Sequence, residues 1–323
     1  EAHCEVLLYT FVCEPIMDGN RLTGVIIENK SGRQAIFAKI IIDSTGDGDI
    51  AAQAGAAYVK GRETDGAMQP ASLMFKIGGV DYSRAVFPGK FEDYIQIPKG
   101  EIQALGKSHL PFPAGHVLLY RSTLPGVVTC NMTNCTGIDG TNAADLSRAV
   151  LVCRNQLQPI LDFLHEFVPG YENCYLLETA SLIGVRETRH FKGLETITEE
   201  DIRSSRVFPD WAVTHASFNF DVHNMTGNGL DATGAQDAFT ATSYTIPYGC
   251  LVPEKIDGLL LAGRNISGTH MAHANYRVMP ICANMGQAAG IAAALCCKED
   301  IQPRNVKVPE LQKLLLQSGV LPV

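Results

Sequence analysis

The feature that most constrains the fold is a pattern that occurs near both ends of the chain. In the run Lys39–Ile42 three isoleucines follow the lysine without alternating with polar residues, and the run ends in Asp43-Ser44-Thr45-Gly46. The run Leu259–Ala262 has the same character and ends at Gly263. Runs of this kind are typical of strands covered on both faces of a mostly parallel sheet. The sequence therefore predicts an α/β domain to which both ends of the chain contribute.

Short strand patterns separated by turns precede the first of these runs. The strands are predicted at Val6–Val12, Leu22–Glu28 and Ala35–Phe37, with turns at Asp18-Gly19-Asn20 and Ser31-Gly32-Arg33. This is the pattern of a β-meander. At the other end, a small-residue helix is predicted at Ile281–Cys297, and a last helix runs from Pro309 to Gly319.

The middle of the chain has a different pattern, so we expect an inserted domain there. A helix with one apolar stripe is predicted from Ala143 to Phe167, kinked at Pro159. A strand is predicted from Tyr175 to His190. The predicted organisation is one domain built from residues 1–61 and 251–323, with an α+β substrate domain inserted at residues 62–250.

Composition narrows the classes of function. The formal net charge is −8, which gives no sign of a surface for nucleic acid or an anionic membrane. The apolar stretch Ile281–Cys297 is interrupted by polar residues and glycines, which favours a buried helix over a membrane span. The ten cysteines do not have the spacing of a zinc or iron–sulfur site, so we expect no metal, reduced thiols and a cytoplasmic protein.

One motif admits an alternative function. Gly46-Asp47-Gly48-Asp49-Ile50-Ala51 matches the dinucleotide fingerprint G-x-G-x-x-A, between a strand pattern and a helix pattern. An NAD(P)-dependent dehydrogenase using this turn is therefore one hypothesis. Against it, Asp47 and Asp49 place carboxylates where a pyrophosphate would approach, and a meander precedes a motif that normally opens its domain. The other reading is a tight strand-to-helix turn that needs glycine.

Two longer segments carry a family resemblance. AKIIIDSTGDGDIAAQAGA resembles the segment that follows the meander in FAD-dependent oxidoreductases of the glutathione-reductase-type flavin fold. YTIPYGCLVPEKIDGLLLAGRNISGTHMAHANYRVMPICANMGQAAGIAAAL is similar to the C-terminal flavin-binding segment of a bacterial FAD-dependent oxidoreductase family with heterodisulfide reductase relatives. The resemblance implies a partial FAD-binding Rossmann-like domain. It also implies hydride transfer between a small-molecule substrate and flavin, and an electron-transfer partner.

The resemblance has one departure. The family's first strand–GxGxxG–helix–strand unit, which binds the ADP half of FAD, is not in this sequence. We therefore expect this chain alone to bind FAD weakly. A non-catalytic fragment or subunit without cofactor is the remaining alternative.

The resemblance also assigns residues to the cofactor. Gly263 would let the backbone approach the pyrophosphate and ribitol, and Arg264 would donate to phosphate oxygens. The helix beginning near Ile281 would direct its N-terminus at the flavin, and Gly286 would let it approach closely. The meander strand would contact adenine through Val12, and the turn at Thr45 and Gly46 would lie near the ADP portion.

Candidate substrate residues follow from side-chain chemistry. On a strand, Arg186 and His190 would share one face, and they suit the anchoring of an anionic substrate. His270, His273 and Arg277 follow the AGRNIS loop toward the flavin, where a histidine could transfer a proton. An ion-paired strand and ordinary hydrogen-bonded histidines are the alternatives that need no function.

Overall fold

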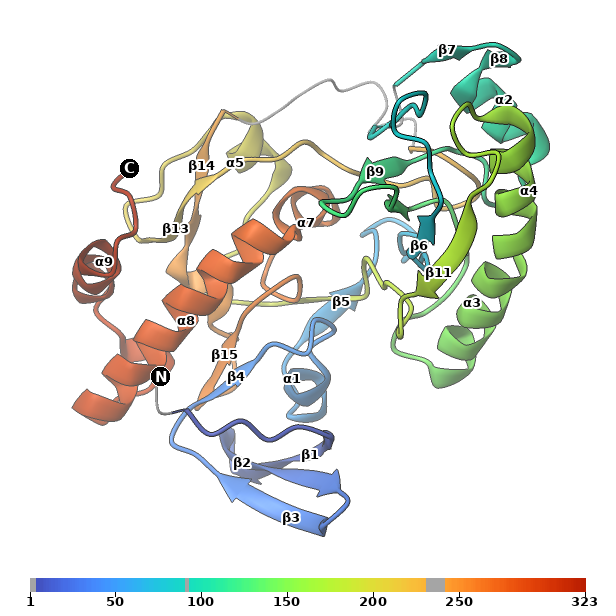
Figure 1. The fold of residues 1–323 in the computed structure, drawn as a ribbon. Coiled ribbons are helices and arrows are strands. Elements are labelled where there is room, and N and C mark those ends of the chain that lie inside the picture. Colours follow the sequence, from blue (N-terminus) through green and yellow to red (C-terminus); the bar gives the residue numbers. More distant parts are fainter. Residues whose placement is uncertain (1–3, 91–92, 231–241) are drawn as a thin grey trace. The chain divides into compact units, whose positions relative to one another are not determined.

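The computed structural model describes residues 4–90, 93–230 and 242–323. The chain forms two compact units (Figure 1). The first comprises Glu1–Gly66, Arg189–Phe220 and Ala238–Val323, and the second comprises Ala67–Thr188 and Asp221–Asp237. The predicted insertion at residues 62–250 is therefore larger than the second unit. Residues 189–220 pack with the first unit because the strands they contain pair with strands of that unit.

The first unit begins with the predicted meander, a three-stranded antiparallel sheet in the order β1-β2-β3. Its strands are β1 (Thr10–Asp18), β2 (Arg21–Asn29) and β3 (Gly32–Phe37). The first strand starts and ends later than the predicted Val6–Val12. Its pairing runs from Thr10 opposite Asn29 to Asp18 opposite Arg21, with irregularities between Val12 and Glu14 and between Ile16 and Met17. The tight turn at Gly19 sets the register of the residues next to it.

The two ends of the chain meet in a pair of parallel strands. Strand β4 (Ile41–Asp43) pairs with β15 (Leu259–Leu261), with Ile41 opposite Leu259. All three leucines of β15 are fully buried, but Ile41 and Ile42 are only half-buried. The expectation of a strand buried on both faces is therefore wrong for β4. Within the described residues β4 pairs with β15 alone, and its other edge has no strand beside it.

The rest of the first unit is two further strand pairs and a set of helices (Figure 1). Antiparallel pairs join β5 to β12 and β13 to β14. The elements are α1 (Asp49–Gln53), β5 (Tyr58–Lys60), β12 (Arg189–Phe191), α5 (Glu199–Arg203), β13 (Trp211–Ala216), β14 (Tyr244–Pro247), η1 (Tyr248–Leu251), α7 (His270–Tyr276), α8 (Met279–Glu299), η2 (Pro303–Asn305) and α9 (Val308–Gln317).

Helix α8 is the predicted small-residue helix, and it is the core helix of this unit. In the described part of the chain it alone is long and apolar enough to cross a bilayer, judged by length and composition only. Its side chains Ile281, Met285, Ala288 and Ala292 are instead buried in the unit's main hydrophobic cluster. Figure 1 shows it running beside β13, with α9 next to it.

The second unit is built on a four-stranded antiparallel sheet in the order β11-β6-β10-β9. Its elements are β6 (Phe75–Gly78), β7 (Gln96–Ile97), β8 (Gly100–Glu101), α2 (Ile102–His109), β9 (Leu119–Arg121), β10 (Val128–Cys130), α3 (Ala143–Asn155), α4 (Leu157–Phe167) and β11 (Tyr175–Thr179). The predicted helix Ala143–Phe167 is two helices that divide at Gln156. The division lies three residues before Pro159, which occupies the first turn of α4, where a missing N–H costs little.

Candidate functional site

The turn after β4 is organised by one buried carboxylate. Asp43 is 2% exposed, and its Oδ1 accepts both the N–H of Thr45, at 3.0 Å, and the Thr45 hydroxyl, at 2.8 Å. Its Oδ2 accepts the N–H of Ala51 at 2.8 Å. The Thr45 hydroxyl in turn accepts the N–H of Asp49 at 3.0 Å. The hydrogen bonds of Thr45 therefore hold the turn together.

This arrangement argues against a dinucleotide fingerprint at Gly46. A fingerprint needs free N–H groups at the start of its helix. In α1, which has only five residues, the N–H groups of Asp49 and Ala51 already donate to side chains of the protein. Both flanking carboxylates are also in ion pairs, Asp47 with Arg264 and Asp49 with Arg189, each at 2.8 Å.

The glycines of this turn are required by its geometry. Gly46 and Gly48 have φ values of +85° and +65°, in the left-handed region that favours glycine. A Cβ at Gly46 would overlap the guanidinium of Arg264, and one at Gly48 would overlap the ring of Phe191. Gly46 is thus a point of close approach between the turn after β4 and the loop after β15.

The loop after β15 holds two buried polar atoms without a hydrogen-bond partner in the described residues. These atoms are Arg264 Nε and Asn265 Oδ1. The other ends of both side chains are anchored, because Arg264 Nη2 donates to Asp47 and Asn265 Nδ2 donates to the carbonyl oxygen of Asp43. Gly263 just before them has φ +113°. A buried unsatisfied donor on a cation is costly, which is the expected condition of a site built for an anionic group.

The N-terminus of α8 adds to this positive region. Its N-cap, Val278, gives no side-chain cap, and its first turn has no acidic residue. Burial raises the pKa of the Cys282 thiol in that turn, and the positive charges of Arg264 and Arg277 oppose the rise. Both guanidinium groups are therefore close enough to act on the first turn of α8. The free N–H groups of a helix start and two cations favour a negative group here.

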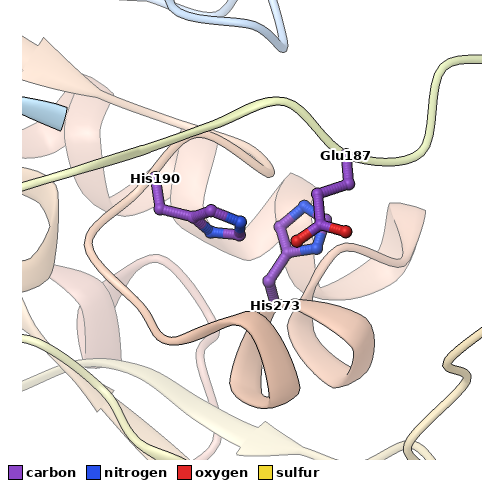
Figure 2. A group of neighbouring side chains, drawn as sticks. All are labelled: Glu187, His190 and His273. Carbon is purple, nitrogen blue, oxygen red and sulfur yellow. The ribbon is translucent and has the colours of Figure 1, made fainter. Parts of the chain in front are cut away.

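Two predicted histidines lie against each other in the first unit. The rings of His190, from β12, and His273, from α7, have centroids 4.7 Å apart and meet nearly at right angles (Figure 2). The two residues are 2% and 1% exposed, and the His273 ring also contacts Tyr276 edge to face. His270 begins α7, and its backbone N–H donates to Glu63 Oε1 at 2.8 Å. Arg277 forms the C-cap of that helix.

Arg186 and His190 do not share a strand. The predicted strand Tyr175–His190 is two separate strands, β11 and β12, and residues 180–188 between them belong to neither. The segment bends at Ser181 and Leu182, and Gly184 then forms an isolated bridge with Ser72. Arg186 belongs to the second unit, where its Nη1 donates to the carbonyl oxygen of Pro70 at 2.6 Å, and His190 belongs to the first. The period-2 argument for a common face is therefore wrong.

Two further predicted cofactor residues have clear positions. Val12 is half-buried on β1, opposite Ile27 of β2. Gly286 lies on the exposed face of α8, and a Cβ there would meet no described atom within 4 Å. Packing inside the first unit therefore does not explain the glycine at 286, and the face is open to approach from outside.

The second unit contains a buried polar cluster, and the sequence patterns did not single out one of its members, His116. His116 and His223 are 6% and 4% exposed, and His223 Nε2 lies 3.3 Å from Asp221 Oδ2. Burial, with the nearby charges of His223 and Arg186, lowers the pKa of His116 to about 3. A lone histidine in a sequence gives no sign of such a cluster, because its members come from distant segments.

Comparisons with known proteins give one match to a protein family. The family described as FAD dependent oxidoreductase matches residues 1–315. No curated protein matches the chain. Solved structures that resemble it include a geranylgeranyl bacteriochlorophyll reductase-like protein from Thermoplasma acidophilum, with 11% identity, a TM-score of 0.45, and coverage of 96% of this chain and 54% of that one.

Two other solved structures resemble the chain more weakly. The p-nitrophenol 4-monooxygenase of Pseudomonas putida has 9% identity and a TM-score of 0.38, with 90% of this chain and 49% of that one covered. A myxobacterial chondrochloren halogenase, an FAD-dependent halogenase, has 13% identity and a TM-score of 0.35, with 94% and 49% covered. The chain thus spans about half the length of the solved structures that it resembles.

Proposed function

The chain belongs to the FAD-dependent oxidoreductase family, and from that premise we propose that its first unit holds FAD at the loop after β15 and the N-terminus of α8. The observation that carries the proposal is the buried donor Arg264 Nε, which has no partner among the described residues; the buried acceptor Asn265 Oδ1 beside it would suit a hydroxyl of the cofactor. When bound, FAD supplies the redox chemistry, accepting or donating hydride at its flavin ring.

The residues fit the chemistry of this cofactor. Arg264 offers a charged, forked donor to a pyrophosphate oxygen, and Gly263 leaves the backbone uncovered beside it. The N–H groups of Met279 and Ile281, in the uncapped first turn of α8, and the charge of Arg277 favour a negative flavin edge. The open face at Gly286 allows a ring system to approach α8.

The remaining predicted cofactor residues act on the ADP side in this proposal. Val12 would contribute its backbone to the adenine end, as the family resemblance implies. Thr45 and Gly46 would act indirectly, because the Thr45 hydroxyl supports the turn and Gly46 leaves room for the Arg264 guanidinium. The NAD(P) hypothesis has no comparable support, since the N–H groups of Asp49 and Ala51 are already bonded within the turn.

On the substrate side, we assign proton handling to the buried histidines of the first unit. His190 and His273 lie in ring contact, so a proton on one changes the electrostatics of the other. His270 and Arg277 bracket the same helix, α7. Arg186 in the second unit would bind an anionic part of a small-molecule substrate. An electron-transfer partner and a reducing, cytoplasmic setting complete the proposal, the latter because the described cysteines from Cys13 onward hold free thiols.

A matched pair of arginine variants tests the cofactor site. Arg264 and Arg304 are similar, with side chains 26% and 29% exposed, and each is in an ion pair within the first unit. Losing a charged hydrogen bond of about 1.5–3 kcal/mol should weaken FAD binding by roughly tenfold to a hundredfold in Arg264→Ala. Arg304→Ala should bind FAD like the unchanged protein.

The measurement is the FAD dissociation constant, from the quenching of flavin fluorescence titrated into the millimolar range, with circular dichroism to check the fold. Equal loss in both variants would assign the effect to stability and overturn the proposed role of Arg264. Unchanged affinity for FAD in Arg264→Ala would also overturn the proposed role of Arg264.

A further inference from the structure

A cavity of about 360 Å³ lies wholly within the second unit. Helix α2 forms one side of it, and the segments around residues 115–116 and 228–230 form the other. Its lining residues are Tyr94, Glu101, Gln103, Ala104, Lys107, Gly115, His116, Asn228, Gly229 and Leu230. This volume lies at the lower end of the range of small-molecule pockets.

Two polar side chains of the lining already have their hydrogen bonds within the protein. Glu101 is the N-cap of α2, and its carboxylate oxygens accept the N–H groups of Gln103 at 2.8 Å and Ala104 at 2.7 Å. Two donors and the positive end of the helix thus compensate its charge. The Gln103 amide exchanges two hydrogen bonds of 2.9 Å with the backbone of Val117.

The lysine among the lining residues, Lys107, differs from Glu101 and Gln103 in its hydrogen bonding. Within the described residues, the Lys107 ammonium on α2 and the Tyr94 hydroxyl make no ion pair or side-chain hydrogen bond. Both side chains are exposed, so they are available at the mouth of the cavity. An ammonium group and a phenol together suit an oxyanion at the mouth.

The buried wall is formed by a histidine that is held neutral. His116 Nδ1 accepts the N–H of Gly229 at 3.3 Å, which places the ring proton on Nε2. In the same cluster, His223 donates its backbone N–H to Gln69 Oε1 at 3.1 Å, and Gln69 Nε2 is buried with no partner among the described residues. Burial lowers the pKa of His116, and a histidine of this kind beside a cavity is a candidate functional group.

We infer that this cavity binds a small organic carboxylate, with the carboxylate at Lys107 and Tyr94 and an apolar body against Ala104, Leu230 and the ring of His116. Every lining residue belongs to the second unit, and the occupancy of the cavity can be measured with or without FAD.

The test uses benzoate as the probe and benzamide as its uncharged counterpart. Isothermal titration of the whole chain should show benzoate binding, with benzamide at least about tenfold weaker, since a charge-assisted bond is worth about one decade or more in affinity. Lys107→Met should weaken benzoate by a similar factor. Lys99→Met is the matched control, because Lys99 is also an exposed lysine of the second unit but lies over Phe167, away from the cavity.

A cavity-filling variant tests the location independently of charge. Ala104 is exposed on α2, so Ala104→Trp should keep the fold and remove benzoate binding. Absence of benzoate binding at millimolar concentrations would overturn the inference. Equal binding of benzoate and benzamide, or unchanged binding in Ala104→Trp, would overturn it as well.

Discussion

Arg264 reaches across 217 positions of sequence to Asp47, and its Nη2 donates to Asp47 Oδ1 at 2.8 Å. The ion pair joins the loop after β15 to the turn after β4, which are also linked by the bond from Asn265 Nδ2 to the carbonyl oxygen of Asp43. In the proposed complex, the Asp47 carboxylate and the pyrophosphate of FAD compete for the Arg264 guanidinium.

The competition at Arg264 can be measured directly. Asp47→Asn removes the negative charge while keeping the shape of the side chain. Because a partly exposed ion pair contributes up to about 1 kcal/mol, FAD should bind roughly twofold to fivefold more tightly in this variant. Asp49→Asn, which disrupts the pair with Arg189 instead, should leave the affinity unchanged. Weaker FAD binding in Asp47→Asn would mean that Asp47 itself holds the cofactor.

The glycine at 48 should be essential for the stability of the first unit. Gly48→Ala would place a methyl group in the ring of Phe191 at φ +65°. A left-handed residue costs about 1–2 kcal/mol and overpacking about 1–3 kcal/mol, so we expect a loss of roughly 2–5 kcal/mol. Gly55→Ala is at φ +89° with open space around it, so it should cost only the left-handed conformation and no overpacking.

Urea unfolding followed by the fluorescence of Trp211, the single tryptophan, reports on this unit. Equal stability losses for the variants at 48 and 55 would show that the contact with Phe191 is unimportant.

The first unit should lose stability as pH rises from about 5 to about 7. Burial, with a hydrogen bond to Asp210 and its negative charge, raises the pKa of the Glu195 carboxyl to about 7. The folded protein therefore holds this proton where the unfolded chain, with an ordinary glutamate pKa near 4.5, releases it. The stabilisation of the folded protein by this bound proton is complete at acidic pH and is lost between about pH 5 and pH 7.

Glu195→Gln should flatten that part of the stability profile, because the amide keeps a donor toward Asp210 without titrating. The melting temperature across this pH range measures the effect, and Glu200→Gln, at an exposed position, is the control. A profile that Glu195→Gln leaves unchanged would assign the pH dependence to another group.

The elements at the two ends of the chain could be predicted because their signals are local. The unalternating apolar runs at β4 and β15 and the small-residue pattern of α8 appear within short windows of sequence. The position of β1 could not be predicted from the sequence, because Glu14 and Pro15 have low strand propensity. They are tolerated because β1 lies at the edge of the meander, where a missing backbone donor costs little.

The cofactor residues stay a prediction, and they could be proposed together because one segment carries the family resemblance. Gly263, Arg264 and Ile281 all lie within that segment. The contact of His190 with His273 joins two distant segments. The pairing of Arg186 with His190 failed because β12 begins only at Arg189, so Arg186 is not in a strand. Period-2 arguments hold only while a strand continues.

The most direct test of the central claim is the set of backbone amide NMR shifts that FAD changes in the labelled protein. The account predicts the largest changes at Arg264, Asn265, Met279 and Ile281, since the loop after β15 and the uncapped start of α8 hold the cofactor. Large changes confined to residues 47–49, with Met279 and Ile281 unmoved, would contradict it and assign the phosphate site to the Gly46 turn.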